Sequence, residues 1–364
     1  MENLVNPAFW ARKRVFLTGH TGFKGAWLAL WLSHMGAQVH GYALPPESAH
    51  SLFAQLDLES RITRSTLADI RDSAALHNAM QAASPDVLFH LAAQALVPTG
   101  YAQPVETFSV NVMGTAKVLE CARACRTLSA IVVVTSDKCY ENHESLWGYR
   151  EVDPMGGHDP YSASKGAAEL VTSSYRRSFF AAQGVAVATA RAGNVIGGGD
   201  TSPSRLIPDA LAAFAQHTPL HLRNPQATRP WQHVLDPLHG YLQLAERLCQ
   251  AGQGSTYAEG WNFGPQPEDA LSVETVIELL AQEWPQPVQW TADPPGTHAH
   301  EAQQLRLDCS KARQRLGWRP VWSGPQALQK TVQWHLSTQA PAGQTAVDVC
   351  HAQLADFLRS ASTK

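Results

Sequence analysis

Short apolar runs alternate with segments of helical periodicity through the first half of the chain. The runs 14–19, 38–43, 63–67, 86–94, 131–134 and 185–191 have the length and the apolar content of buried strands. Between them, the segments 26–32, 74–82 and 104–125 repeat apolar residues with the period of a helix. This alternation predicts an α/β fold with a doubly wound parallel sheet and right-handed crossovers.

The pattern changes after residue 191. The run Gly197-Gly198-Gly199-Asp200 and the prolines that follow indicate a loop, and 207–216 is helical. The run 257–263 predicts a strand that returns to the first sheet, so two lobes interleave in the sequence. A chain of 364 residues also exceeds what one core usually supports. The expected units are a first lobe (1–193 and 234–264), a smaller α/β lobe (194–233 and 265–340) and a C-terminal tail (341–364).

Composition narrows the class of protein. A formal charge of −3 without a clustered basic face disfavours nucleic-acid binding, and 44% hydrophobic residues are ordinary for a globular protein. No apolar run is long enough to span a membrane, and the N-terminus lacks the pattern of a signal peptide. The six cysteines show neither C-x-x-C nor zinc-ligand spacing, so we expect no metal and a reducing, cytoplasmic compartment.

A glycine-rich turn joins the first strand to the first helix. Gly19 would permit a tight turn, Gly22 close approach of a ligand to the backbone, and Gly25 close packing of helix on strand. The N–H groups at the start of the helix would then face a pyrophosphate. Three glycines alone also fit a structural loop, but their position between an N-terminal strand and a helix predicts a Rossmann-type dinucleotide site.

Other strand ends extend this expected cofactor site. The second strand ends in Tyr42-Ala43-Leu44-Pro45, without the acid that often binds the adenosine ribose, so this position leaves NAD and NADP open. Asp69 follows the third strand and could meet the adenine. The small residues after Leu91 would let the backbone approach a cofactor closely.

Two short segments contain residues that can transfer protons. Ser136, Asp137 and Lys138 follow the fifth strand, and open α/β sheets place their chemistry at such strand ends. Tyr161 and Lys165 open the next helix, where positions i and i+4 share a face. An ammonium about 4 Å from the phenol would supply roughly the 4 kcal/mol needed to lower its pKa from about 10 to about 7. The alternative is a surface Tyr–Lys pair, which the glycine turn disfavours.

Longer motifs surround these residues. They include Thr18-Gly-x-x-Gly-x-x-Gly25, Leu91-Ala-Ala-Gln94, Tyr161-x-x-x-Lys165, Arg191-Ala-Gly-Asn-Val-Ile-Gly197 and Leu316-Gly-Trp-Arg-Pro320. Together these resemble the extended short-chain dehydrogenase/reductase family. Within it, the chain is most similar to the CDP-glucose 4,6-dehydratases, through Gly19-His-Thr-Gly-Phe-Lys-Gly25, Thr135-Ser-Asp-Lys-Cys-Tyr-Glu141, Gly148-Tyr-Arg-Glu151, Arg229-Pro-Trp-Gln-His-Val234 and Trp261-Asn-Phe-Gly-Pro265.

The resemblance implies NAD-dependent dehydration of CDP-D-glucose to CDP-4-keto-6-deoxy-D-glucose, for deoxysugar and surface polysaccharide (lipopolysaccharide) synthesis. Tyr161 would take the proton of the 4-hydroxyl while C4 is oxidised, and Ser136 would donate a hydrogen bond to the 4-oxygen. Asp137 is implied as the acid for the departing 6-hydroxyl and Lys138 as the base at C5. An adjacent acid and lysine can instead form an ion pair that disarms both, although neighbours in an extended segment point to opposite faces.

The resemblance and the strand ends together give the expected binding residues. Those for the cofactor are Gly19, His20, Thr21, Gly22, Phe23, Lys24, Gly25, Asp69, Ile70, Leu91, Ala92, Ala93, Asn111, Thr135, Tyr161 and Lys165. Those for the nucleotide-sugar substrate are Gln94, Ser136, Asn194, Arg205, Arg229 and Arg306. The arginines suit a diphosphate because a planar guanidinium fork matches phosphate oxygens. Arg229 is the best candidate for the diphosphate, and Arg306 and the cluster His298-x-His300-Glu301 are weaker ones. A zinc site at this cluster is disfavoured, because nothing nearby completes a third ligand.

Alternative functions stay open. A nucleotide-sugar 4-epimerase, or a 4,6-dehydratase for a UDP-, GDP- or dTDP-sugar, would share Tyr161 and Lys165. Asp137 and Lys138 favour dehydration, because an epimerase needs no acid and base at C5 and C6. A cofactor-binding protein without activity would need none of these four residues. The resemblance also implies a homodimer, packed through the long helix at 104–125 and the helix that begins near Tyr161.

Overall fold

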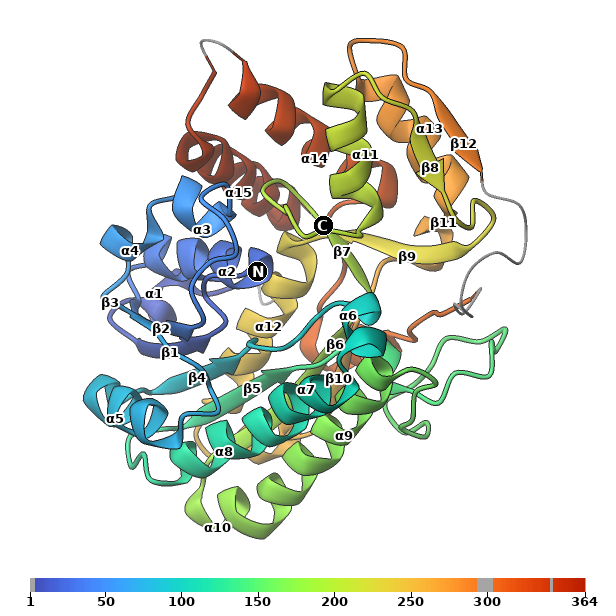
Figure 1. Ribbon diagram of the computed structural model, residues 1–364. Helices are drawn as coiled ribbons and strands as arrows, with labels where there is room; N and C mark the ends of the chain where they lie inside the picture. The colour runs from blue at the N-terminus through green and yellow to red at the C-terminus, as the bar shows by residue number, and fades with distance from the viewer. Residues whose placement is uncertain (1–3, 293–303, 341–342, 364) are drawn as a thin grey trace.

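Two lobes enclose a central cavity in the computed structural model of the protein, which describes residues 4–292, 304–340 and 343–363 (Figure 1). The strands of the first lobe are β1 (Arg14–Thr18), β2 (Gln38–Ala43), β3 (Arg64–Leu67), β4 (Val87–His90), β5 (Ala130–Val134), β6 (Ala186–Ala192) and β10 (Gly260–Phe263). They form one sheet in the order β10-β6-β5-β4-β1-β2-β3, and all neighbours are parallel. The expected doubly wound parallel sheet is therefore confirmed, including the late strand that returns to its edge.

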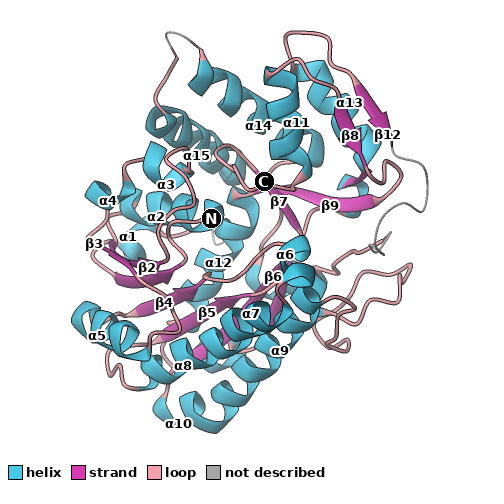
Figure 2. Ribbon diagram, in the orientation of Figure 1, coloured by secondary structure: helices cyan, strands magenta, loops and turns pink. Residues whose placement is uncertain are grey.

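Both faces of this sheet are covered by helices. The helices of the two layers are α2 (Phe23–His34) and α12 (Leu235–Leu248) on one face, and α5 (Ser73–Ala83), α8 (Thr115–Arg123) and α9 (Pro160–Tyr175) on the other (Figure 2). Successive side chains of a strand point to opposite faces. Val15 and Leu17 accordingly pack in the core that contains α2 and α12, and Phe16 packs in the core that contains α5 and α8. Burial on both faces is why these strands are continuous apolar runs.

The helix expected over 104–125 contains a π-helical turn. Its parts are α7 (Pro104–Phe108), the π-helical segment η1 (Ser109–Gly114) and α8. Such turns are frequent at functional sites. Asn111 lies in η1 and is 2% exposed, so its amide is available to groups inside the protein.

The second lobe contains two small sheets. Its elements are β7 (Asn194–Ile196), β8 (Leu220–Leu222), β9 (Thr228–His233), β11 (Ala270–Ser272), β12 (Trp290–Ala292), α11 (Leu206–Ala215), α13 (Val273–Glu283) and α14 (Gly324–Gln339). β9 pairs in parallel with β7 and antiparallel with β11, while β8 pairs with β12. Ile196, Trp231 and Ile277 are buried in its own apolar core. The helix expected over 207–216 is confirmed as α11.

The C-terminal segment 341–364, expected only as a tail, contains a helix that packs on the first lobe. Phe357 of α15 (Ala346–Ser362) is fully buried. Its ring centroid lies 5.8 Å from that of Trp31 on α2 and 5.2 Å from that of Trp322. Helix α15 therefore contributes to the core of the first lobe.

Short helical segments connect these elements. They are α1 (Pro7–Trp10), α3 (Leu52–Gln55), α4 (Leu58–Arg61), α6 (Val97–Ala102), η2 (Asp137–Cys139), η3 (Arg176–Phe180), α10 (Ala181–Gln183), η4 (Gly254–Tyr257), η5 (Pro267–Asp269) and η6 (Ala312–Leu316). Of these, α3, α6 and η2 border the cavity.

Candidate active site

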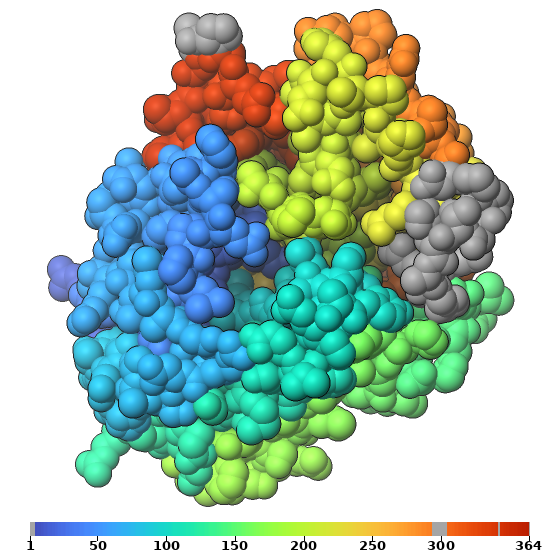
Figure 3. All heavy atoms as spheres, viewed as in Figure 1, coloured from blue at the N-terminus to red at the C-terminus, as the bar shows by residue number. Residues whose placement is uncertain are grey.

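A cavity of about 2160 Å³ lies between the carboxyl ends of the sheet strands and the second lobe. The order of the sheet changes direction between β1 and β4, and open α/β sheets bind their ligands at this switch point. The walls come from the ends of β1, β4 and β5, the start of α9, and β7, α11 and β9 of the second lobe. Figure 3 shows the hollow between the blue N-terminal part of the chain and the yellow-green part of the second lobe.

The glycine turn between β1 and α2 forms one wall of this cavity. Gly19 has φ +80°, and a Cβ there would lie 2.7 Å from the backbone nitrogen of Ala92, after β4. A Cβ on Gly25 would overlap the carbonyl oxygen of Gly19, whereas the nearest atom to a Cβ on Gly22 would be 3.5 Å away. The fold therefore requires Gly19 and Gly25. Gly22 instead leaves the wall open in front of the N–H groups that begin α2.

The other residues of the turn do not all face the cavity. Thr21, Phe23 and Lys24 line it, as expected. His20 does not, because its ring packs against Gly41 on β2, where a Cβ would overlap it. The His20 ring therefore fills the space that a glycine leaves on the neighbouring strand, and the expected contact of His20 with the cofactor stays a prediction.

The expected cofactor residues at the other strand ends do line the cavity. They are Asp69, Ile70, Leu91, Ala92, Ala93 and Thr135. The carboxylate of Asp69 is held by Arg71, whose Nε lies 3.0 Å from both oxygens and whose Nη2 lies 2.6 Å from Oδ2. These hydrogen bonds from Arg71 lower the pKa of Asp69. Asp69 therefore faces the cavity as one half of an ion pair.

Asn111 supports the site from behind and does not line the cavity. Its Oδ1 accepts a hydrogen bond from the N–H of Gln94 at 2.8 Å, and its Nδ2 donates to the carbonyl oxygen of Gln94 at 3.0 Å. The same Nδ2 donates to Oγ of Ser164 on α9 at 2.8 Å. The Asn111 amide therefore joins the loop after β4 to α9, and its expected contact with the cofactor stays a prediction.

After β5, the backbone of the catalytic segment enters the 3₁₀ helix η2 and does not stay extended. Ser136 caps η2, and its Oγ accepts a hydrogen bond from the N–H of Lys138 at 3.2 Å. The same hydroxyl donates to Oδ1 of Asp137 at 3.0 Å. The expectation that Asp137 and Lys138 point to opposite faces of an extended segment is therefore wrong, because the backbone turns as soon as the sheet ends.

Asp137 is enclosed, with 3% of its surface exposed. Burial raises the pKa of its carboxyl, and the charge of Lys138 and the hydrogen bond from Ser136 oppose this only in part. Among the described residues, no ion pair joins Asp137 to Lys138, and Oδ2 of Asp137 has no hydrogen-bond partner. Since burial favours its protonated form, Asp137 can serve as a proton donor.

Helix α9 carries Tyr161 and Lys165 on one face, as its sequence predicts. Burial raises the pKa of Tyr161 to about 12, although a hydrogen bond with Ser136 lowers it. Burial lowers the pKa of Lys165 to about 8, and its Nζ donates to the carbonyl oxygen of Val134 at 3.4 Å. The lowered pKa expected for Tyr161 is thus not produced by the protein alone, because the cost of burying a phenolate outweighs the charges around it.

Five of the six expected substrate residues line the cavity, namely Gln94, Ser136, Asn194, Arg205 and Arg229. Nη1 of Arg205 forms an ion pair with Oδ2 of Asp200 at 3.0 Å. Arg306 is the exception: it lies outside the cavity, where its carbonyl oxygen accepts a hydrogen bond from the N–H of Tyr149. Its expected contact with the substrate stays a prediction.

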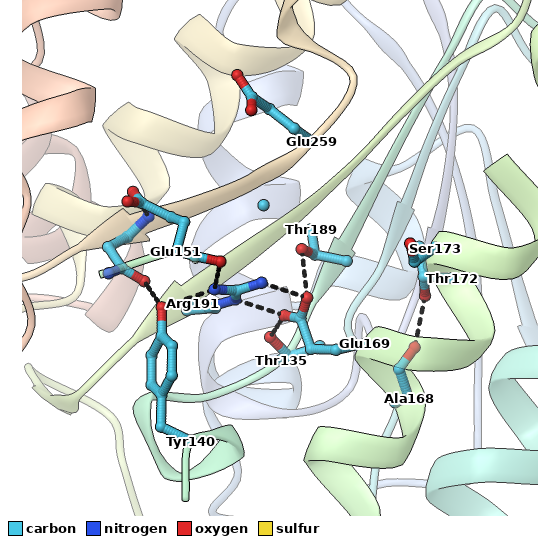
Figure 4. A network of polar contacts seen from close by, with 12 residues as sticks. Thr135, Tyr140, Glu151, Ala168, Glu169, Thr172, Ser173, Thr189, Arg191 and Glu259 are labelled. Carbon is cyan, nitrogen blue, oxygen red and sulfur yellow. Dashed lines mark hydrogen bonds and ion pairs between the residues drawn. The ribbon is translucent and has the colours of Figure 1, made fainter. Parts of the chain in front are cut away.

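A buried ion pair behind the catalytic segment is not among the sequence expectations. Glu169 on α9 and Arg191 on β6 each have 5% of their side chain exposed, and their charged atoms lie 2.7 Å apart (Figure 4). Glu169 follows Lys165 by four residues on the same helix face, and Arg191 stands in an otherwise apolar strand. A charge at each of two positions predicted to be buried is the signal that could have revealed this pair.

The described residues contain no group of three or more His, Cys, Asp or Glu side chains arranged to hold a metal ion. The cluster His298-x-His300-Glu301 lies outside the described residues. In the part of the chain that the structure describes, no helix is both long and apolar enough to cross a membrane.

The chain is similar to proteins of known activity. Residues 16–331 match the family model described as GDP-mannose 4,6 dehydratase. A CDP-glucose 4,6-dehydratase of Salmonella typhimurium is 50% identical over 337 residues, which cover 91% of this chain and 93% of that protein. A dTDP-glucose 4,6-dehydratase of Xanthomonas campestris is 27% identical, over 74% of this chain and 78% of that protein. A solved structure of a dTDP-glucose 4,6-dehydratase from Streptomyces venezuelae, with NAD bound, is 25% identical and has a TM-score of 0.72, over 88% of this chain and 96% of that chain.

The two kinds of glycine in the turn should respond differently to alanine. Gly25→Ala should lower the melting temperature strongly or prevent folding, because its methyl group overlaps the backbone of Gly19. Gly22→Ala should melt like the wild type but bind NAD about tenfold or more weakly, because its methyl group stands in front of the start of α2. Thermal unfolding and an NAD titration measure the two effects. Normal NAD affinity in folded Gly22→Ala would contradict the assignment of this wall to the pyrophosphate.

Proposed function

Since the chain belongs to the GDP-mannose 4,6-dehydratase family, within the extended short-chain dehydrogenases/reductases, we propose that it converts CDP-D-glucose to CDP-4-keto-6-deoxy-D-glucose. The reaction oxidises C4, removes water across C5 and C6, and returns the hydride to C6. The 50% identity to a CDP-glucose 4,6-dehydratase supports the choice of substrate. The observation that carries the proposal is that Asp137 and Lys138 share one cavity with Tyr161 and Lys165.

The first lobe fits NAD as its cofactor. The backbone of the glycine turn approaches the end of β4 so closely that Gly19 leaves no room for a side chain, while Gly22 keeps the wall open. Thr21, Phe23 and Lys24 on one side and the small residues after Leu91 on the other would hold the dinucleotide. When bound, NAD supplies a reversible hydride acceptor and a positive charge that favours ionisation of the nearby phenol.

Tyr161 is the base for the 4-hydroxyl in this proposal. Its hydroxyl is hydrogen-bonded with Ser136, and Lys165 follows one turn later on the same helix face. Burial disfavours charge on each of these two side chains taken singly. The ammonium of Lys165 and the positive charge of bound NAD would both favour the phenolate, and together they would lower the Tyr161 pKa that burial raises.

Asp137 and Lys138 provide the acid and the base for the elimination of water. A keto group at C4 makes the C5 proton acidic, and loss of water then needs a base at C5 and an acid at the 6-hydroxyl. Asp137 suits the acid because burial keeps its carboxyl protonated to a higher pH. Lys138 is half-buried and lines the same cavity. Since the two are not ion-paired in the described structure, neither side chain neutralises the other.

The second lobe would hold the nucleotide and the diphosphate. Asn194, Arg205 and Arg229 line the cavity from that side, and Gln94 lines it from the first lobe. The pairing of Arg205 with Asp200 fixes the guanidinium at the start of α11. This supports the division into a cofactor lobe (1–193 and 234–264) and a substrate lobe (194–233 and 265–340).

An exposed apolar surface on α7, η1 and α9 supports a homodimer. Val105, Met113 and Leu170 are 81%, 55% and 63% exposed, and Phe108 is 38% exposed. Exposed apolar side chains gathered on neighbouring helices favour an interface between copies. All six cysteines have free thiols, which supports the expected cytoplasmic location. The product would enter deoxysugar and surface polysaccharide synthesis.

The substrate is tested by incubating the protein with CDP-, UDP- and dTDP-glucose and following the sugar by NMR. We expect a 4-keto-6-deoxy sugar from CDP-glucose, because Asp137 and Lys138 lie in the same cavity as Tyr161. A product epimerised at C4 with its 6-hydroxyl intact would identify an epimerase instead. Turnover of another nucleotide sugar in preference to CDP-glucose would correct the substrate.

Measurements in D₂O distinguish the role of Lys138 from that of Asp137. Lys138→Met should reduce exchange of the C5 hydrogen with solvent by about 10²- to 10⁴-fold, the usual contribution of a general base. Asp137→Asn should keep this exchange but lose water elimination, because only the proton donor is removed. NMR of the sugar in D₂O measures both rates. Exchange at the wild-type rate in Lys138→Met would rule out Lys138 as the base.

The dimer is tested by placing charge on the apolar surface. Met113→Glu combined with Leu170→Glu should give a monomer, because two copies of each carboxylate would be buried across the two-fold axis. Val152→Glu is the control, since Val152 is 82% exposed in a loop outside this surface. Light scattering during gel filtration reports the mass. A monomeric wild type at micromolar concentration would reject the dimer.

A further inference from the structure

The catalytic segment 136–138 is anchored at both of its ends to the buried Glu169–Arg191 ion pair. Thr135 stands directly before the segment, and Tyr140 follows soon after it. Figure 4 shows both residues pointing toward the pair, Thr135 from the end of β5 and Tyr140 from the loop after η2.

The first anchor runs through Glu169. Its Oε1 accepts hydrogen bonds from Oγ1 of Thr135 at 2.5 Å and from Nε of Arg191 at 2.9 Å. Its Oε2 accepts from Oγ1 of Thr189 on β6 at 2.7 Å and from Nη2 of Arg191 at 2.7 Å. Each oxygen of the Glu169 carboxylate therefore accepts two hydrogen bonds, and these fix the orientation of the carboxylate.

The second anchor runs through Arg191. Its Nη1 donates to the hydroxyl of Tyr140 at 2.6 Å, and its guanidinium carbon lies 5.1 Å from the centre of the Tyr140 ring. The Tyr140 hydroxyl in turn donates to Oδ1 of Asn262 on β10 at 2.7 Å. A Cβ on Gly260 would overlap the guanidinium, so the backbone of β10 closes the space around it.

The ion pair also belongs to the helix that carries the other half of the site. Tyr161, Lys165 and Glu169 follow one another at intervals of four residues on α9. A rigid helix therefore connects the groups that act at C4 of the sugar with the carboxylate that holds the segment acting at C5 and C6. Buried ion pairs contribute little net stability, and their best-supported use is to specify one arrangement.

We propose that Glu169 and Arg191 are positioning residues that hold Asp137 and Lys138 at a fixed place relative to Tyr161 and Lys165. The pair touches neither substrate nor cofactor and acts through Thr135 and Tyr140. This inference rests on the proposed function, because it assigns the pair to coupling oxidation with elimination. Removal of the hydrogen bond from either Thr135 or Tyr140 to the pair then slows the elimination of water more than it weakens substrate binding.

Two threonines that donate to the same carboxylate provide the test. Thr135→Val removes the bond at the start of the catalytic segment, and Thr189→Val removes the matching bond to the other oxygen, away from the segment. A merely structural role predicts equal effects. Positioning predicts that Thr135→Val lowers kcat about 10- to 100-fold at nearly unchanged KM for the sugar nucleotide when NAD is saturating, while Thr189→Val keeps near wild-type kcat. Tyr140→Phe, which cuts the other anchor, should behave like Thr135→Val.

A second measurement does not depend on turnover. Backbone hydrogen exchange in a peptide that covers 134–140 should become faster in Thr135→Val and Tyr140→Phe than in Thr189→Val, at similar melting temperatures. Equal losses of kcat and equal exchange in the two valine variants, or no change in Thr135→Val, would overturn the proposal. A wild type without dehydratase activity would instead reject the proposed function, and the exchange comparison would still decide whether the pair holds the segment.

Discussion

The close packing of α9 against the chain that leaves β5 is the constraint on which the active site depends. A Cβ on Gly166 of α9 would lie 3.0 Å from the carbonyl oxygen of Cys139 and 2.8 Å from that of Gly156, so the two backbones approach as closely as a glycine allows. Oγ of Ser164 on the same helix accepts a hydrogen bond from the side-chain amide of Asn111. With this helix fixed, the position of every proton-transfer group it carries is fixed as well.

Burial acts on the ionisable groups of this site in opposite directions. It raises the pKa of Asp137 and Tyr161 and lowers that of Lys165, because it penalises whichever form is charged. Glu169 shows the other outcome: although burial disfavours its charge, the guanidinium of Arg191 lowers its pKa. One enclosed region therefore contains three groups whose charged forms are destabilised by burial and one charged pair, Glu169 and Arg191, that is held by its own hydrogen bonds. Their neighbours, and not their depth, decide which role each group takes.

What the sequence predicts correctly is local. The strands, the glycine turn and the shared face of Tyr161 and Lys165 follow from the spacing of residues a few positions apart. The contacts that the sequence does not show involve partners that are distant along the chain. The His20 ring packs against Gly41 on another strand, Asn111 donates to Ser164 on another helix, and the carbonyl oxygen of Arg306 accepts a hydrogen bond from Tyr149.

The same reason explains why the Glu169–Arg191 pair was missed. Each charge stands at a position that the pattern predicts to be buried, but only the packing of α9 on β6 shows that the two are partners. The 3₁₀ helix η2 (Asp137–Cys139) was also missed, because the polar residues after the strand do not show whether the backbone stays extended. Ser136, as the cap of η2, is the one residue whose type marks that point.

The docking of α15 on the first lobe determines when that lobe can finish folding in the cell. Phe357 fills the same core as Trp31, which lies far earlier in the chain. A ribosome releases the chain from its N-terminus onward, so this core stays incomplete until α15 has been made. The strand β10 that completes the edge of the sheet is also made after the other six strands. The nascent chain must therefore keep apolar surface of its first lobe exposed, or bound to a chaperone, until α15 has been made.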